Sequence, residues 1–90
     1  MFQYLEICRF VFGDAIGGTY KTIGLTTTDD ECANVVRRKE PTANSATRGQ
    51  KTGPCYAGFG ATATDSQFDF RTCLFDQGQL RFFHIQRKIS

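Results

Sequence analysis

The chain has 90 residues, with 11 basic and 9 acidic side chains and a formal net charge of +2. This length leaves room for one hydrophobic core, so we expect a single domain over residues 1–90. The net charge is too small to indicate a nucleic-acid binder, and no apolar run approaches the roughly 18 residues of a membrane-spanning helix. We therefore expect neither a nucleic-acid partner nor a membrane span.

The four cysteines, Cys8, Cys32, Cys55 and Cys73, are scattered along the chain without a C-x-x-C pair. Zinc sites need paired ligands at short spacing, so this pattern favours two disulfides over a metal site. Two disulfides in turn indicate an oxidising compartment, and we expect a secreted protein. Four cysteines allow three pairings, and all three stay open at this point.

The N-terminal residues 2–12 are aromatic and β-branched, with apolar residues at both parities. Alternate residues of a strand point to opposite faces, so apolar residues at both odd and even positions predict a strand that is covered on both faces. The turn sequence "GDAIGG" ends the strand, and "TYKTIGL" (residues 19–25) predicts a second, short strand.

The stretch "DDECANVVRRKEP" predicts the one helix of the chain. Thr28, followed three residues later by Glu31, is a capping-box pattern, and Pro41 ends the helix because it disfavours helical geometry at the residue before it. Three apolar residues at i, i+3 and i+4 spacing are expected to share the buried face: Cys32, Val35 and Val36.

The basic residues Arg37, Arg38 and Lys39 at the end of this helix have two interpretations. Acidic residues at the start of a helix and basic ones at its end complement the helix dipole, each by a few tenths to about 1 kcal/mol. The same residues are also candidates for the rim of a ligand site. The dipole explains them without a ligand, but it does not exclude one.

Four further strands are predicted, over residues 45–48, 55–62, 68–75 and 80–89. The strand at 55–62 places Cys55, Ala57 and Phe59 on one face, and the strand at 68–75 is expected to do the same with Phe68, Phe70 and Leu74. One helix among several antiparallel strands is an α+β domain.

The segments "ECANVVRRKEPTANSATRG", "PCYAGFG" and "FRTCLF" resemble a PAN/Apple-type domain, in particular a divergent four-cysteine branch of secreted invertebrate proteins. The resemblance covers residues 18–75. It implies an antiparallel sheet of about five strands with one helix packed across it, stapled by the disulfides Cys32–Cys55 and Cys8–Cys73.

The chain departs from the pattern of these domains at three positions. The second helix-to-sheet disulfide of the usual PAN domain would begin at about Val36, so apolar packing of Val36 must replace it. Gly58 stands where the pattern usually has Glu, and Arg48 stands where it often has an aromatic residue. If these two positions contact a ligand in related domains, the ligand of this chain differs or is missing.

No catalytic, metal or cofactor site is predicted. The sequence has no Ser, His and Asp set at a recognisable spacing, and the four cysteines are assigned to disulfides. Asp65, Asp69 and Asp76 lack the spacing of a calcium loop, which favours solvated acidic residues over a metal site. We expect the protein not to be an enzyme.

The resemblance implies a non-catalytic recognition module that binds a glycan or an extracellular protein, and we expect a lectin-like domain. Sugar sites combine planar hydrogen-bonding groups with an aromatic platform. The candidates near the end of the helix and in the following loops are Arg37, Arg38, Arg48, Lys51 and Tyr56.

The alternative is a structural protein that self-assembles outside the cell. Its terminal strands are rich in aromatic residues, and exposed apolar faces or strand edges would drive a homo-oligomer. The residues concerned are Phe2, Tyr4, Phe10, Phe12, Phe82 and Phe83.

Overall fold

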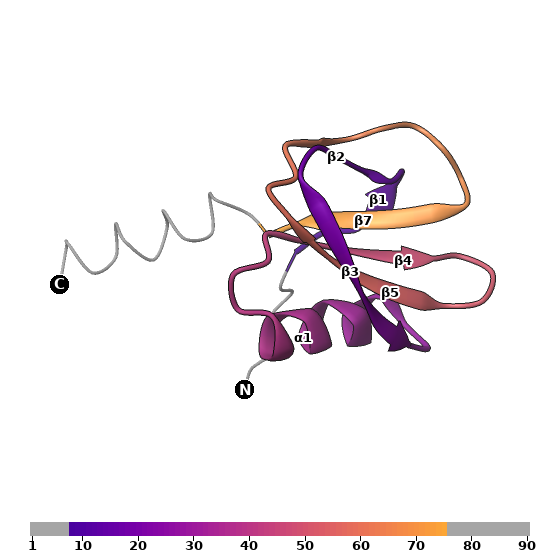
Figure 1. Cartoon of the computed structure of the whole chain (residues 1–90). Helices are drawn as coiled ribbons and strands as arrows, with labels where there is room; N and C mark the ends of the chain where they lie inside the picture. The colour runs from indigo at the N-terminus through magenta and orange to yellow at the C-terminus, as the bar shows by residue number, and fades with distance from the viewer. Residues whose placement is uncertain (1–7, 76–90) are drawn as a thin grey trace, which may run out of the picture.

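The computed structural model describes residues 8–75 and shows one helix beside two antiparallel sheets (Figure 1). The elements are β1 (Val11–Phe12), β2 (Ala15–Ile16), β3 (Thr19–Leu25), α1 (Asp29–Lys39), β4 (Ser45–Gly49), β5 (Pro54–Phe59), β6 (Ala63–Thr64) and β7 (Phe70–Leu74). The main sheet has the order β1-β7-β4-β5-β3, and β2 pairs with β6 in a separate two-stranded sheet. All pairings between these strands are antiparallel. The predicted α+β class is confirmed.

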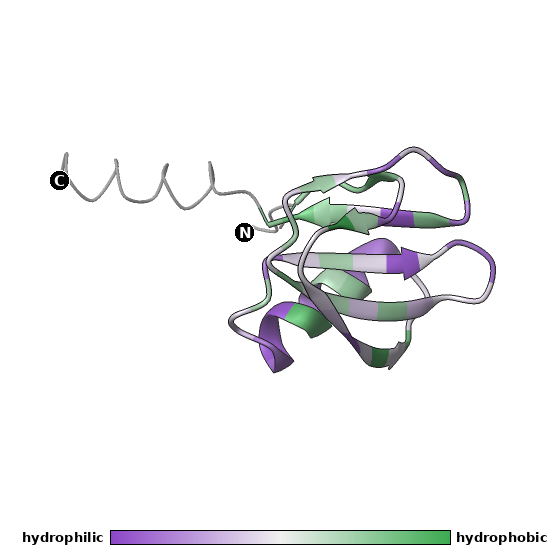
Figure 2. Cartoon of the chain, turned by 45° about the horizontal axis from the view of Figure 1, so that its top comes forward, coloured by the Kyte–Doolittle hydropathy of each residue, from purple (hydrophilic) through white to green (hydrophobic). Residues whose placement is uncertain are grey.

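Helix α1 is capped at its N-terminus as the sequence predicts. The Thr28 hydroxyl accepts a hydrogen bond from the Glu31 amide at 3.0 Å. In a standard capping box the Glu31 carboxylate would accept a hydrogen bond from the Thr28 amide. Here it accepts instead from the amide and the hydroxyl of Thr27, at 2.8 and 2.9 Å. The helix ends at Lys39, and its acidic and basic ends flank a more hydrophobic middle (Figure 2).

The core lies between α1 and one face of the main sheet; its buried members are mostly small, and larger, partly buried side chains such as Phe59 and Phe75 pack against them. Its buried members are Cys32, Ala33 and Val36 from the helix, Ala43 from the following loop, and Ala46, Cys55, Ala57 and Cys73 from the strands. Small side chains let the helix approach the sheet closely, but they bury little apolar area. Of the two valines predicted for the buried face of the helix, Val36 is completely buried and Val35 is half-buried. Ala33, which the prediction did not place on that face, is also buried.

Two disulfides reinforce this small core. Cys32–Cys55 joins α1 to β5 with a Cα–Cα distance of 5.5 Å, and Cys8–Cys73 joins the segment before β1 to β7 with a Cα–Cα distance of 5.6 Å. These are the two pairs that the PAN/Apple resemblance implies. Small domains often depend on such cross-links because their cores alone give little stability.

The first and last residues of several predicted strands differ from those in the structure. Of the predicted strand at residues 2–12, only Val11–Phe12 of the described part pairs in the sheet; residues 8–10 are not in a strand, and the rest lies outside the described residues. Strand β5 ends at Phe59 rather than at residue 62, because Gly60 takes a left-handed conformation with φ of 85°. The predicted strand at residues 80–89 also lies outside the described residues.

The prediction for the strand at residues 68–75 was wrong about Phe68, whereas Phe70 and Leu74 lie on one face of the strand as expected. Strand β7 begins only at Phe70, and Phe68 in the preceding loop is 77% exposed. Cys73 points to the helix because it belongs to the core cluster, so its neighbours Thr72 and Leu74 point to the opposite face.

Candidate functional site

A cleft of about 340 Å³ lies on the face of the main sheet that α1 does not cover. Ala46 and Ala57 pack against the helix, so the adjacent residues Thr47 and Tyr56 point to the other side of the sheet. Those two residues form part of the floor of the cleft, and the chain from Asp14 to Tyr20, which includes β2, contributes a wall.

Three aromatic rings stand together at this cleft. The ring centroids of Tyr20 and Tyr56 are 5.7 Å apart with an angle of 84° between their planes, and those of Tyr56 and Phe70 are 6.3 Å apart with an angle of 64°. Such edge-to-face contacts are favourable, and they leave the rings unstacked.

Glycines in the neighbouring strands make room for these rings. Tyr20 lies directly opposite Gly58, and Phe70 lies opposite Gly49. Because neither glycine has a side chain, the two rings can lean diagonally across the sheet toward Tyr56.

Gly58 is the most constrained residue of the floor. It pairs with Ser45 on β4, and a Cβ atom at Gly58 would lie 2.0 Å from the Ser45 hydroxyl oxygen. Ser45 is fully buried, and among the described residues its hydroxyl has no hydrogen-bond partner. The Glu that the PAN/Apple pattern usually has at position 58 therefore cannot fit here unless Ser45 moves or changes.

A chain of hydrogen bonds fixes the polar groups under the cleft. The Thr72 hydroxyl donates to the Gly13 carbonyl at 2.8 Å, and it also lies 2.8 Å from the Thr47 hydroxyl. A hydroxyl has one proton, so Thr47 must be the donor in the bond to Thr72. Thr47 is among the residues that line the cleft, and its hydroxyl has no proton left for a ligand, so in a hydrogen bond with a ligand it could only accept.

Asp14 is the one charged side chain among the residues that line the cleft. Its Oδ1 atom accepts a hydrogen bond from the Ala15 amide at 2.8 Å, and its own amide donates to the Asp65 carboxylate at 2.7 Å. These two bonds fix the loop that presents the Asp14 carboxylate. A second carboxylate, that of Asp65, adds to the negative charge on this side of the cleft.

The five candidates named from the sequence do not come together in one place. Tyr56 lines the cleft, whereas Arg37 and Arg38 lie in the last turn of α1 on the other side of the sheet. The Arg37 guanidinium lies 5.5 Å from the centroid of the Phe75 ring. Lys51 is exposed in the turn that joins β4 to β5.

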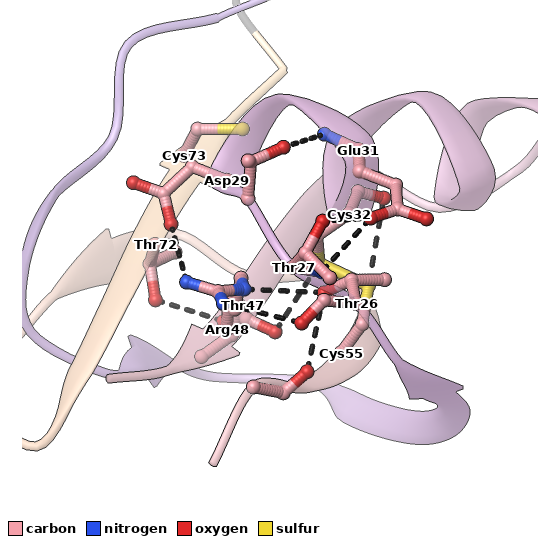
Figure 3. Close-up of a disulfide and its surroundings, with 12 residues drawn as sticks. Thr26, Thr27, Asp29, Glu31, Cys32, Thr47, Arg48, Cys55, Thr72 and Cys73 are labelled. Carbon is pink, nitrogen blue, oxygen red and sulfur yellow. Dashed lines mark hydrogen bonds and ion pairs between the residues drawn. A yellow bond between two sulfur atoms is a disulfide. The ribbon is translucent and has the colours of Figure 1, made fainter. Parts of the chain in front are cut away.

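Arg48 is occupied by contacts that hold the start of α1 to the sheet (Figure 3). It donates from Nε and Nη2 to the hydroxyl and the carbonyl of Thr26, at 3.2 and 3.1 Å, and its Nη1 atom lies 3.5 Å from Asp29. Arg71 lies opposite Arg48 in the sheet, and its Nε atom lies 2.7 Å from the same Asp29 carboxylate. One acidic residue of the first helical turn thus neutralises two adjacent arginines.

Sequence reasoning found Tyr56 but missed Tyr20, Phe70 and Asp14. The available signal is strand parity: a residue next to a disulfide cysteine in a strand must point away from the helix to which that cysteine is bonded. This rule places Tyr56 on the open face. It does not place Tyr20, because the pairing of β3 with β5 sets the position of that ring.

A second hollow of about 310 Å³ lies at the start of α1, beside Cys8, Asp29 and Arg71. Asp29 and Arg71 in this hollow already form an ion pair with each other, so they have fewer free hydrogen-bonding groups for a ligand than the residues of the cleft. Within residues 8–75 there is no group of three or more side chains that could hold a metal ion, and no helix of that part is long and apolar enough to cross a membrane. Comparisons with family models, with curated proteins and with solved structures find no match.

Proposed function

We propose that the chain is a secreted, non-catalytic recognition module of PAN/Apple-like type, and that it binds carbohydrate in the cleft on the open face of its sheet. The observation that carries this proposal is the cleft itself, in which Tyr20, Tyr56 and Phe70 stand beside the carboxylate of Asp14 and the hydroxyl of Thr47.

The chemistry of the cleft suits a sugar. Sugar rings have apolar C–H faces that pack on aromatic rings, and their hydroxyl groups need fixed hydrogen-bond acceptors. Asp14 and Thr47 are such acceptors, and both are held by other hydrogen bonds of the fold. The volume of about 340 Å³ falls in the range of about 300–1,000 Å³ that is usual for small-molecule sites.

Exposure of Tyr20 also supports a binding role. The side chain is 74% exposed, although it is large and partly apolar, so burial in the core does not explain it. Aromatic residues that are rigid and exposed beside a hollow are common anchors of binding sites. The two disulfides support the proposed extracellular location, because such bonds persist in oxidising compartments.

A glycan array followed by isothermal titration calorimetry tests this function. We expect at least one sugar class to bind, and Tyr20→Ala to weaken that binding by about tenfold or more, as expected for the loss of a central contact. Phe68→Ala is the matched control, because Phe68 is equally exposed but does not line the cleft. An array without any bound glycan, or equal losses in both variants, would contradict the proposal.

Self-assembly is the second candidate, and the exposed edge of β3 favours it. This seven-residue strand lies at one edge of the described sheet, and Leu25 at its end is 77% exposed. Open strand edges can pair with another copy of the chain. Sedimentation velocity at micromolar concentrations tests this candidate: we expect dimers or larger species if it is right, and a strict monomer would exclude it.

A further inference from the structure

We propose that the cleft selects sugars that carry a protonated amine, in other words amino sugars whose nitrogen is not acetylated. This inference rests on the proposed function, because it names the ligand class for the same cleft.

Charge is the first argument. Asp14 is the one charged residue that lines the cleft, and the Asp65 carboxylate lies nearby, since it accepts a hydrogen bond from the Asp14 amide. No lysine or arginine is among the residues that line the cleft. A cationic ligand is therefore attracted at close range, whereas a sugar acid or a sulfated sugar is repelled.

The available hydrogen-bonding groups give the second argument. Thr47 can only accept from a ligand, because its proton is donated to Thr72, and an ionised carboxylate such as Asp14 is also purely an acceptor. An ammonium group has three N–H donors and no acceptor, so it matches this set. Acetylation would replace the ammonium by an amide, which has one N–H donor and no charge.

The aromatic rings give the third argument. Cations bind to the faces of aromatic rings because the ring quadrupole places negative potential there. Tyr20, Tyr56 and Phe70 meet at steep angles and line the cleft together with Asp14. Aromatic rings beside an acceptor are the typical surroundings of a bound alkylammonium group.

Calorimetric titration of the whole chain with three β-1,4-linked tetrasaccharides tests the inference. The ligands are the tetramers of glucosamine, N-acetylglucosamine and glucose. They share a backbone and differ only at the C2 substituent of each ring, which is an amine, an acetamido group or a hydroxyl. At about pH 6, amines whose pKa lies near 8 are protonated. We expect the glucosamine tetramer to bind about 3- to 10-fold more tightly than the other two, and this preference to shrink as salt is added.

Two variants locate the origin of that preference. Asp14→Asn keeps the oxygen that accepts from the Ala15 amide but removes the charge, so we expect it to abolish the preference for the glucosamine tetramer over the two neutral tetramers. Asp30→Asn makes the same charge change on the first turn of α1, outside the cleft, and should keep the preference. The chain as a whole carries a net charge of +2, so its overall field cannot create a preference for a cation.

The outcomes separate this inference from the proposed function. Equal binding of the three tetramers, a preference for a neutral tetramer, or a preference that survives in Asp14→Asn would overturn the inference and leave a neutral-sugar lectin. Absence of binding by all three also overturns it, and the proposed function fails with it only if the glycan array is blank as well. If Asp14→Asn does not fold, the comparison of the three ligands on the native chain still decides.

Discussion

The two faces of the main sheet use their side chains in opposite ways. On the face that α1 covers, the disulfide Cys32–Cys55 and the pairs of Asp29 with Arg48 and Arg71 join side chains to one another. On the open face, Tyr20 is mostly exposed and Asp14 is the one charged side chain of a cleft. Groups that already pair with each other have few hydrogen bonds left for a ligand, so the candidate ligand site lies on the open face.

Alternation along single strands creates this contrast. In β5, Cys55 and Ala57 pack under the helix, and the intervening Tyr56 and the following Gly58 line the cleft. One strand of six residues therefore supplies both a disulfide cysteine of the core and two of the residues that line the candidate site. Substitutions on the covered face should consequently lower stability, and substitutions on the open face should weaken ligand binding.

Removal of the buried disulfide should have the largest effect on the covered face. The double variant Cys32→Ala/Cys55→Ala opens a loop with a sequence separation of 23, for which the chain-entropy model gives a loss of about 3 kcal/mol in the free energy of unfolding. Urea titration monitored by circular dichroism measures this loss.

The control for the disulfide variant lies on the other face. Tyr20→Ala removes a larger side chain, yet we expect it to change the free energy of unfolding by no more than about 0.5 kcal/mol, because the side chain is 74% exposed. A large loss of stability in Tyr20→Ala would show that the open face is structural, and would break the distinction between the two faces.

The contact between Gly58 and Ser45 offers a sharper test of the cleft floor. Gly58→Ala places a Cβ atom 2.0 Å from the Ser45 oxygen, and overpacking of this kind costs about 1–3 kcal/mol. Ser45→Ala alone should be neutral or slightly stabilising, because it removes a buried hydroxyl that has no partner among the described residues.

A double-mutant cycle checks this interpretation. In the Ser45→Ala background the added methyl group at position 58 meets the Cβ atom of residue 45 at 3.4 Å, so most of the cost of Gly58→Ala should disappear. Additive costs in the double variant would show that another contact, or the backbone of β5, forbids a side chain at position 58.

The covered face could be predicted from sequence far better than the open one. The cap at Thr28 and the end of the helix at Lys39 follow from local chemistry, and the strand at residues 19–25 has the predicted bounds. The cleft depends on pairing between distant strands, since Tyr20 reaches Tyr56 only through the register of β3 on β5. No pattern within one segment encodes that register.

Arg48 shows the same limit for charged residues. In the sequence it is a basic residue in a polar region, which is equally compatible with a ligand and with solvent. Its contacts with Thr26 and Asp29 require that β4 lie under the start of the helix. The position in the fold, and not the residue type, therefore decides that Arg48 and Arg71 form ion pairs with Asp29, whereas the arginines at the end of α1 do not.

Loss of the shared carboxylate at the start of the helix should have a moderate effect. Asp29→Asn leaves Arg48 and Arg71 directly opposite each other without their common counter-charge, and we expect a loss of about 1–2 kcal/mol in the free energy of unfolding. Asp30→Asn removes a charge from the same helical turn but from an exposed residue, and should cost less than about 1 kcal/mol. Equal losses would mean that the helix dipole, not the two arginines, makes Asp29 important.

The smallest expected effect is the pH dependence of the helix cap. The pKa of Glu31 is lowered from its ordinary value of 4.5, first because the Thr27 amide donates to its carboxylate and then because the Thr27 hydroxyl does. A carboxyl whose pKa is lower in the folded state stabilises the fold above its unfolded pKa, and this contribution is lost as the pH falls through the folded pKa. Glu31→Gln should therefore be less stable than the native chain near neutral pH, and the difference should shrink as the pH falls through the lowered pKa of Glu31.

Thr27→Val divides the effect between its two causes. It removes the hydroxyl donor and keeps the backbone amide, so the difference in stability between neutral and acidic pH should be reduced but not abolished. Thermal unfolding of the native chain and both variants between about pH 3 and pH 7 measures this order, with the native chain steepest and Glu31→Gln flattest. If Thr27→Val is as flat as Glu31→Gln, the hydroxyl and not the amide is the main cause, and the cap is held by side chains alone.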